Sequence, residues 1–276
     1  MSRKLSEYNK VCCFDTETTG TRTKPEVLPD GTIIDVDQII ELGLVVYGKD
    51  ENGKFTKQLV KKDLFVKTVD GRRLEDMVIS RTDIDGNSMT IASLTGITTK
   101  MLETSGVTEK EMVDEVFHDI FDKDTLILGY NLGFDLRMIL NAIHKYYPAF
   151  VFEGNYDALD AMTMYKDFYA YDSNLGHDGN KLGQRLDAAV SHLKVTVQNT
   201  HRACDDADAT WEVFKELYKQ IGKFQPYVNT FGYNPKFGLQ EPISGIRYFP
   251  QGFRGVKEVL CASAKEWYKN HPEVKK

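Results

Sequence analysis

An apolar run that ends in two closely spaced carboxylates constrains this chain more than any other stretch. Val11 to Phe14 are apolar, and Asp15 and Glu17 follow at once. If the run is a buried strand, side chains two residues apart point to the same side, so both carboxylates project together from its C-terminal end. Two like charges this close repel each other, and a divalent cation such as Mg²⁺ or Mn²⁺ relieves the repulsion. The simpler alternative is a polar strand end followed by a turn that Gly20 closes.

The order of the predicted elements places that strand in an α/β domain. Three strands come first, and strands then alternate with helices, which favours a mixed five-stranded sheet flanked by helices. A long loop at 21–37 and a polar segment at 70–92 interrupt the pattern. The predicted strands are 11–15, 38–47, 55–69, 125–129 and 151–152, and the predicted helices are 98–102, 108–121, 134–147, 158–170, 181–193 and 203–221.

Net charge and amino-acid composition change near Ile221. The whole chain has a net charge of −6, but residues 221–276 carry nine Lys or Arg against four Glu. That segment is therefore basic, and the first 220 residues are strongly acidic. We interpret 1–221 as one domain and 222–276 as a basic, aromatic-rich C-terminal extension packed on it.

Composition excludes several classes of protein. No stretch approaches the length of a membrane span and no signal peptide heads the chain, so we expect a cytoplasmic protein with no membrane partner. The cysteines show no metal-binding spacing, and we expect neither a disulfide framework nor a zinc site. They are Cys12, Cys13, Cys204 and Cys261.

Three further positions carry acidic or imidazole side chains in suggestive places. Asp135 follows the apolar run 125–129 at the start of a predicted helix, while His201 and Asp206 lie at the start of the helix 203–221. Taken singly, each has an ordinary explanation: a helix cap or first-turn charge for Asp135, a solvated loop histidine, and a surface charge for Asp206.

Together these positions resemble the DEDDh branch of the DnaQ-like 3′–5′ exonucleases, which have the ribonuclease H-like fold. The resemblance spans residues 10 to about 219. The first motif is Phe14 to Gly20, the second is Asn131 to Asp135, and the third is His201 with Asp206 five residues later. The stretches Gln38–Gly43 and Leu94–Thr98 are also similar to family elements.

The resemblance implies a set of roles. Two divalent cations, Mg²⁺ or Mn²⁺, would be held by Asp15, Glu17, Asp135 and Asp206, with Asp15 bridging both, and His201 would act as general base on the attacking water. Residues around the first and second motifs and the segment near Leu94 would approach the 3′ end of the substrate. The predicted substrate-binding residues are Thr16, Thr18, Leu94, Thr95, Met101, Asn131 and Phe134; a buried core position is the alternative for Met101.

The expected function is a metal-dependent 3′–5′ exonuclease that acts on the 3′ end of DNA or RNA. The first motif and the Leu94–Thr98 stretch favour single-stranded DNA and a proofreading or repair enzyme, with a DNA polymerase as a candidate partner. The alternatives are an RNA-trimming exoribonuclease, a catalytically inactive nucleic-acid-binding module on the same fold, and a structural protein. Basic residues that could hold the substrate, or form a solvated face, are Lys57, Lys61, Lys62, Lys67, Arg72, Arg73, Lys236, Arg247, Arg254 and Lys257.

Overall fold

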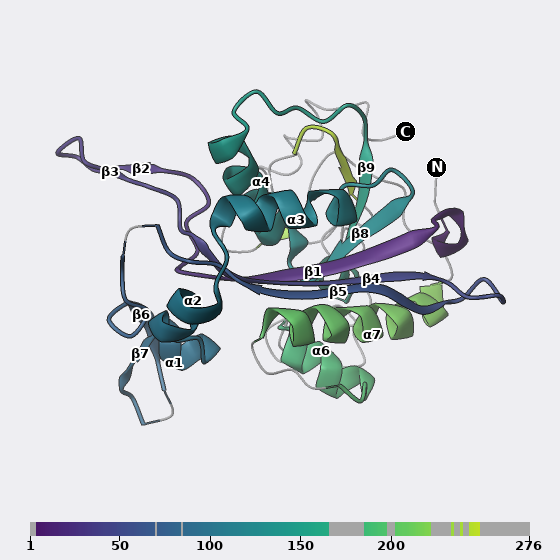
Figure 1. Ribbon diagram of the computed structural model, residues 1–276. Helices are drawn as coiled ribbons and strands as arrows, with labels where there is room; N and C mark the ends of the chain where they lie inside the picture. The colour runs from purple at the N-terminus through teal and green to yellow at the C-terminus, as the bar shows by residue number, and fades with distance from the viewer. Residues whose placement is uncertain are drawn as a thin grey trace.

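A mixed sheet of six strands forms the centre of the computed structural model (Figure 1). The structure describes residues 4–69, 71–83, 85–165, 185–197, 202–221, 233–234, 238–239 and 243–248. The strand order is β12-β9-β8-β1-β4-β5; β12, β9, β8 and β1 run parallel, and β4 and β5 are antiparallel to their neighbours. The strands are β1 Lys10–Thr18, β4 Ile39–Lys49, β5 Phe55–Phe65, β8 Thr125–Gly129, β9 Tyr156–Asp160 and β12 Ile246–Tyr248.

Helices cover both faces of this sheet (Figure 1). α3 (Glu109–Ile120) and α4 (Leu132–Tyr146) lie on one face, and α6 (Leu186–Leu193) and α7 (Ala203–Ile221) lie on the other. Because side chains alternate along a strand, Cys12 and Phe14 of β1 join the core under α3 and α4, whereas Val11 and Cys13 join the core under α7. β1 therefore contributes side chains to the hydrophobic cores on both faces of the sheet, and its polar C-terminal end lies between the two helical layers. The short α5 (Ala161–Tyr165) follows β9 and packs in the α7 layer.

Smaller elements surround one end of the sheet. The polar segment after β5 forms a hairpin of β6 (Val78–Thr82) and β7 (Ser88–Thr90), then α1 (Ile91–Thr95) and α2 (Thr99–Ser105). These elements have their own hydrophobic cluster, which includes Ile40 of β4. A single 3₁₀ turn, Leu5–Glu7, precedes β1.

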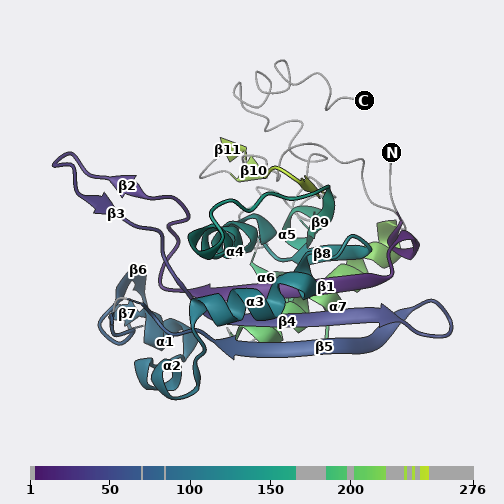
Figure 2. The ribbon, with the colours of Figure 1, turned by 45° about the horizontal axis from the view of Figure 1, so that its top comes forward.

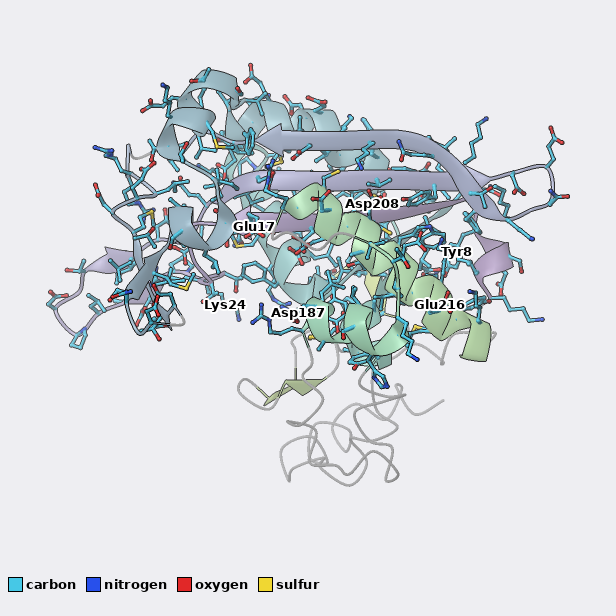
Figure 3. The ribbon with its side chains drawn as sticks, turned by 90° about the horizontal axis from the view of Figure 1, so that it is seen from below. Tyr8, Glu17, Lys24, Asp187, Asp208 and Glu216 are labelled. Atoms are coloured by element: carbon cyan, nitrogen blue, oxygen red, sulfur yellow. The ribbon has the colours of Figure 1, made fainter. Side chains whose placement is uncertain are left out.

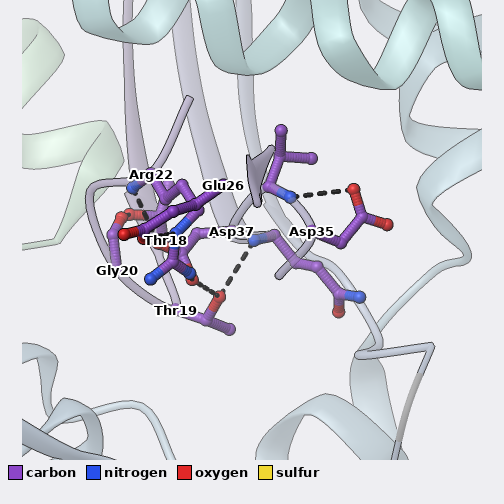
Figure 4. Close-up of polar contacts among 9 residues, drawn as sticks. Thr18, Thr19, Gly20, Arg22, Glu26, Asp35 and Asp37 are labelled. Atoms are coloured by element: carbon purple, nitrogen blue, oxygen red, sulfur yellow. Dashed lines mark hydrogen bonds and ion pairs between the residues drawn. The ribbon is translucent and has the colours of Figure 1, made fainter. Parts of the chain in front are cut away.

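The loop predicted at 21–37 is an arm that projects from the body (Figure 2). It contains a two-stranded hairpin of β2 (Glu26–Val27) and β3 (Ile33–Ile34). Its base is closed by Arg22, which donates its backbone N–H to Asp37 (2.7 Å; Figure 4). The backbone N–H of Gln38 donates to the hydroxyl of Thr19, just after β1 (2.9 Å). Asn141 of α4 adds a bond to the carbonyl oxygen of Thr23 (2.9 Å).

The mixed sheet flanked by helices is confirmed, but the predicted number of five strands is wrong. The sheet has six strands, because β12 from the C-terminal extension pairs with β9. Arg247 of β12 donates to the buried carboxylate of Asp157 (2.6 Å), which also accepts the Tyr8 hydroxyl (2.8 Å). The division of the chain at residue 221 stays a prediction.

The fifth predicted strand and the helix after it are displaced. The strand lies at Tyr156–Asp160 instead of 151–152, and the helix starts at Ala161 instead of 158. All five residues of β9 are buried, and a short run buried on both sides has no alternation to separate it from a helix. Residues 166–170 of the predicted helix, and 181–184 of the next one, lie outside the described residues. Where the chain is described, no helix combines the length and apolarity needed to cross a bilayer.

Candidate active site

Asp15 and Glu17 project from the C-terminal end of β1 on the face that α7 covers, as the period of the strand predicted. Their partners across the antiparallel ladder are Gly43 and Glu41 of β4. Directly opposed residues on neighbouring strands share a face, so these four positions form one patch of the sheet beneath α7. In Figure 3, Glu17 lies near the beginning of α7, with Asp208 and then Glu216 following along that helix.

Gly43 lets the start of α7 lie directly on this patch. A Cβ atom at Gly43 would be 2.0 Å from the backbone nitrogen of Cys204 and 2.1 Å from the carbonyl carbon of Ala203. These distances are far below van der Waals contact, so a side chain here would push the helix away. The close approach brings Asp206, in the first turn of α7, to the two carboxylates of β1.

Three carboxylates converge as a result. One oxygen from each of Asp15, Glu17 and Asp206 lies within 4.8 Å of the other two. Asp206 is 8% exposed, and its buried Oδ1 has no hydrogen-bond partner among the described residues. A buried, unpaired carboxylate oxygen is costly. The donor set is all oxygen, which suits Mg²⁺ or Mn²⁺, so these residues fit a divalent cation.

Asp135 reaches the same strand end from the opposite layer. It lies in the first turn of α4, is 3% exposed, and its Oδ1 accepts from the backbone N–H (3.1 Å) and hydroxyl (2.6 Å) of Thr16. Its charge contributes to the raised pKa of both Asp15 and Glu17. The predicted acids of β1, α4 and α7 are thus neighbours, although Asp135 stands outside the group of three that meet within 4.8 Å.

The carboxyl groups hold their protons more tightly than usual. Burial is the main cause, and it raises the pKa of Asp15 well above its ordinary range and that of Glu17 to about 8. Burial likewise raises the pKa of Asp206 to about 7, and that of Asp135 to about 7 against the opposing hydrogen bonds from Thr16. The negative charges of the neighbouring acids add to the effect at Asp15, Glu17 and Asp206. A bound cation would reverse this balance, because it stabilises the ionised carboxylates.

The predicted substrate-binding residues of the two motifs are close to this cluster. The Thr16 hydroxyl is engaged with Asp135, and the Thr18 hydroxyl donates to the carbonyl of Gly20 (2.6 Å). Asn131 precedes α4 with an exposed side chain and a left-handed backbone (φ 64°), which costs energy for a residue other than glycine. Phe134 is partly buried against the α3 and α4 core. Their roles toward substrate stay predictions.

The other predicted substrate residues lie on α1 and α2. Leu94 and Met101 are partly exposed, whereas Thr95 is 3% exposed and its hydroxyl donates to the carbonyl of Ile91 (2.9 Å). Thr95 therefore stabilises α1 itself. Contact of this region with a substrate stays a prediction. His201, the predicted general base, lies outside the described residues, which resume at Arg202.

Several of the predicted basic contacts are engaged with acids. Lys61 pairs with Asp208 (2.7 Å), and Lys62 pairs with Asp119 (2.9 Å). The Arg247 side chain is used to hold β12. Contact of these three side chains with a phosphate backbone stays a prediction.

The sequence analysis missed two groups that support the cluster. Glu41 is wholly buried and accepts hydrogen bonds from Arg202 and from the backbone N–H of Ala203. Asp160, at the end of β9, accepts the backbone N–H of Asn131 (2.8 Å) and so holds its left-handed conformation. The available signal for both was an acid next to otherwise apolar strand residues, which costs energy to bury and needs a partner.

The chain spans only part of the known proteins that it resembles. The structure is similar to E. coli exonuclease I in complex with a dT13 oligonucleotide, with 18% identity and a TM-score of 0.53 over 76% of this chain and 41% of that chain. Exonuclease I from Methylocaldum szegediense gives 19% identity and a TM-score of 0.52 over 77% of this chain and 40% of that one. At this identity the likeness shows the fold alone.

Sequence comparisons point the same way. A PolC-type DNA polymerase III of Latilactobacillus sakei subsp. sakei (strain 23K) is 24% identical over 191 residues, which are 66% of this chain and 12% of the polymerase. The model of the exonuclease family RNase_T matches residues 12–214. Because that match covers most of the chain, the protein belongs to the exonuclease family, and the predicted resemblance to the DnaQ-like 3′–5′ exonucleases is confirmed.

Proposed function

We propose that this protein hydrolyses phosphodiester bonds from the 3′ end of single-stranded DNA, with divalent cations held by the carboxylates at the end of β1. The observation that supports this most is the convergence of Asp15, Glu17 and Asp206 within 4.8 Å, with one buried Asp206 oxygen lacking a partner, in a chain of the exonuclease family. An ordinary cap or surface charge would have a hydrogen-bond partner or contact solvent.

Asp15, Glu17 and Asp206 would hold the cations, with Asp135 beside them. Bound there, Mg²⁺ or Mn²⁺ would lower the pKa of an attacking water and stabilise the charge that develops on the leaving 3′-oxygen. Thr16 fixes the carboxylate of Asp135 with two hydrogen bonds, so this side chain is oriented before any ligand binds. We assign His201 as the general base, because an imidazole exchanges a proton readily near neutral pH.

The similar solved structures support single-stranded DNA as the substrate. One of them is E. coli exonuclease I with a dT13 oligonucleotide. The match to a PolC-type polymerase supports a second possibility for the same activity, proofreading beside a DNA polymerase. The strongly acidic first 220 residues also fit a site in which cations must be bound before a phosphate backbone approaches.

The activity is tested by incubating the full chain with 5′-labelled single-stranded DNA and with RNA of the same sequence, in Mg²⁺, Mn²⁺ or EDTA. We expect a ladder of products that shorten from the 3′ end, in either metal but not in EDTA, and faster on DNA. The Asp15→Asn variant should lose the ladder and keep the circular dichroism spectrum of the parent.

Other outcomes assign other functions. A faster ladder on RNA would identify an exoribonuclease. Binding without shortening in every metal would identify an inactive nucleic-acid-binding module and would contradict the proposal. Activity of the Asp15→Asn variant equal to that of the parent would remove the carboxylate cluster from the mechanism.

A further inference from the structure

An ion pair between a buried glutamate and a partly exposed arginine lies beside the carboxylate cluster, at the point where α7 begins. Glu41 of β4 is 0% exposed and accepts from Arg202 through Nε (2.7 Å) and Nη2 (2.5 Å) on its Oε1. Its other oxygen accepts the backbone N–H of Ala203 (3.0 Å), the first residue of α7. A helix begins with N–H groups that lack partners within the helix, so a carboxylate from the sheet satisfies one of them here.

Arg202 is held on further sides. Its Nη2 lies 3.3 Å from Asp63 of β5, and its guanidinium lies 5.0 Å from the centre of the Phe65 ring. Its carbonyl oxygen accepts the backbone N–H of Asp206 (3.0 Å). Arg202 therefore connects two strands of the sheet to the residue that completes the carboxylate cluster.

We propose that Glu41 and Arg202 are positioning residues that set the distance of Asp206 from Asp15 and Glu17, and thereby the affinity of the site for its divalent cation. This inference rests on the proposed function. Glu41 faces the same side of the sheet as Glu17, its partner across the ladder, so the pair fixes α7 against β4, next to the strand β1 that carries the other ligands. We call Glu41, Arg202 and the N–H of Ala203 the helix clamp.

Removing the charge of Arg202 distinguishes a positioning role from a purely electrostatic one, because the two roles predict opposite changes in metal affinity. Arg202 is a cation close to the cluster, and it lowers the pKa of Glu17. If electrostatics alone governed the affinity, Arg202→Gln would remove a positive charge near the cluster, and the divalent cation would bind there more tightly. By positioning, the same substitution frees the start of α7 and weakens binding, because supporting partners of metal ligands are typically worth about 10–100-fold in affinity.

The test measures Mn²⁺ binding to the full chain by titration calorimetry, without substrate. We expect about tenfold weaker binding in Arg202→Gln. Arg202→Lys, which keeps the charge, should also bind more weakly, because a single ammonium cannot reproduce the planar fork that joins Glu41 to Asp63. Unchanged or tighter binding in Arg202→Gln would overturn the proposal; if that variant does not fold, unchanged binding in Arg202→Lys would do so.

Lys145 and Glu109 provide a matched control. Glu109 is 7% exposed and pairs with Lys145 (2.6 Å), where α3 meets α4. Lys145→Gln likewise removes the cation from a buried carboxylate, away from α7, and should leave Mn²⁺ binding unchanged. Equal weakening in this control would show that general destabilisation, rather than the clamp, governs the affinity.

Turnover at high metal adds a readout that separates the clamp from the activity itself. We expect the DNA-degrading rate of Arg202→Gln to approach that of the parent at saturating Mn²⁺, because the reacting residues are intact. A rate that stays low at every Mn²⁺ concentration would contradict a role through metal affinity. If the parent chain neither binds Mn²⁺ nor shortens DNA, the proposed function fails; if it does both and Arg202→Gln matches it, only the clamp fails.

Discussion

Asp15, Glu17 and Asp206 face one another in the folded chain, and each has a raised pKa. An acid whose pKa is higher in the folded state than in the unfolded state binds protons more tightly when folded. Its contribution to stability is then present at low pH and is lost as pH rises through the folded pKa. The cation-free protein is therefore under its greatest electrostatic strain at neutral and alkaline pH.

We predict that the melting temperature of the cation-free chain falls between pH 5 and pH 8, the window bounded above by the pKa of about 8 for Glu17. Added Mg²⁺ should raise the melting temperature more at pH 8 than at pH 5, because the ionised carboxylates bind the cation. Scanning calorimetry in EDTA and in Mg²⁺ measures how the melting temperature changes with pH in each condition. Asp206→Asn is the control, and it should flatten both pH dependences. A parent chain whose melting temperature in EDTA rises over this window would contradict the account.

Among single residues, the sequence predicted the acids of the cluster but not the residues that hold them in place. The spacing of Asp15 and Glu17 after an apolar run placed both on one side of a strand, and the structure confirms it. At Glu41 the sequence shows only an acid among apolar strand residues and cannot identify its partners, because Arg202 and Ala203 lie about 160 residues away and only the folded sheet brings them together. The role of His201 stays a prediction.

At the scale of elements, the approach of α7 to β4 decides whether the cluster forms. Gly43 makes this approach possible, since its missing side chain leaves room for the backbone of Cys204. The prediction of a second strand at 38–47 and a last helix at 203–221 was confirmed, but their contact at this glycine could not be read from either segment alone.

We predict that Gly43→Ala destabilises the chain by about 1–3 kcal/mol, because the added methyl group overpacks the interface and displaces the helix. The displacement should also weaken Mn²⁺ binding. Denaturant unfolding and calorimetry measure the two effects. Gly154→Ala is the control, since the nearest atom to its Cβ position is 4.0 Å away. A Gly43→Ala chain with the stability and Mn²⁺ affinity of the parent would refute the close packing.

The misplaced elements have a common physical cause. The strand β9 was predicted to begin at 151, five residues before its start at Tyr156, because its residues are buried on both sides and show no alternation. The arm at 21–37 was predicted as a loop because its strands are two residues each, too short for a pattern. Pairing with other strands in the folded chain, rather than local sequence preference, determines where β9 and the hairpin of the arm form.

At the scale of the whole molecule, the central sheet includes a strand from beyond residue 221. β12 extends the sheet, and Arg247 neutralises Asp157, which is 4% exposed. The alternation of strands and helices predicted the α/β architecture, but a three-residue strand in a Gly- and Pro-rich extension had no signal of its own.

We predict that Arg247→Gln lowers the free energy of unfolding by about 1–3 kcal/mol, because it leaves a buried carboxylate with a missing partner. Urea unfolding measures the change. Arg73→Gln should change stability by less than about 0.5 kcal/mol, because Arg73 is exposed and its pairs are 3.9 Å and 4.0 Å long. Equal effects of the two substitutions would show that β12 contributes little to the stability of the sheet.

The location of bound Mn²⁺ in a crystal tests the central claim most directly. Anomalous diffraction from crystals of the full chain grown with Mn²⁺ should show a peak about 2 Å from oxygens of Asp15, Glu17 and Asp206. Crystals of Asp206→Asn grown in the same way should show a weaker peak or none. A parent crystal with Mn²⁺ bound elsewhere and no peak among these carboxylates would contradict the account.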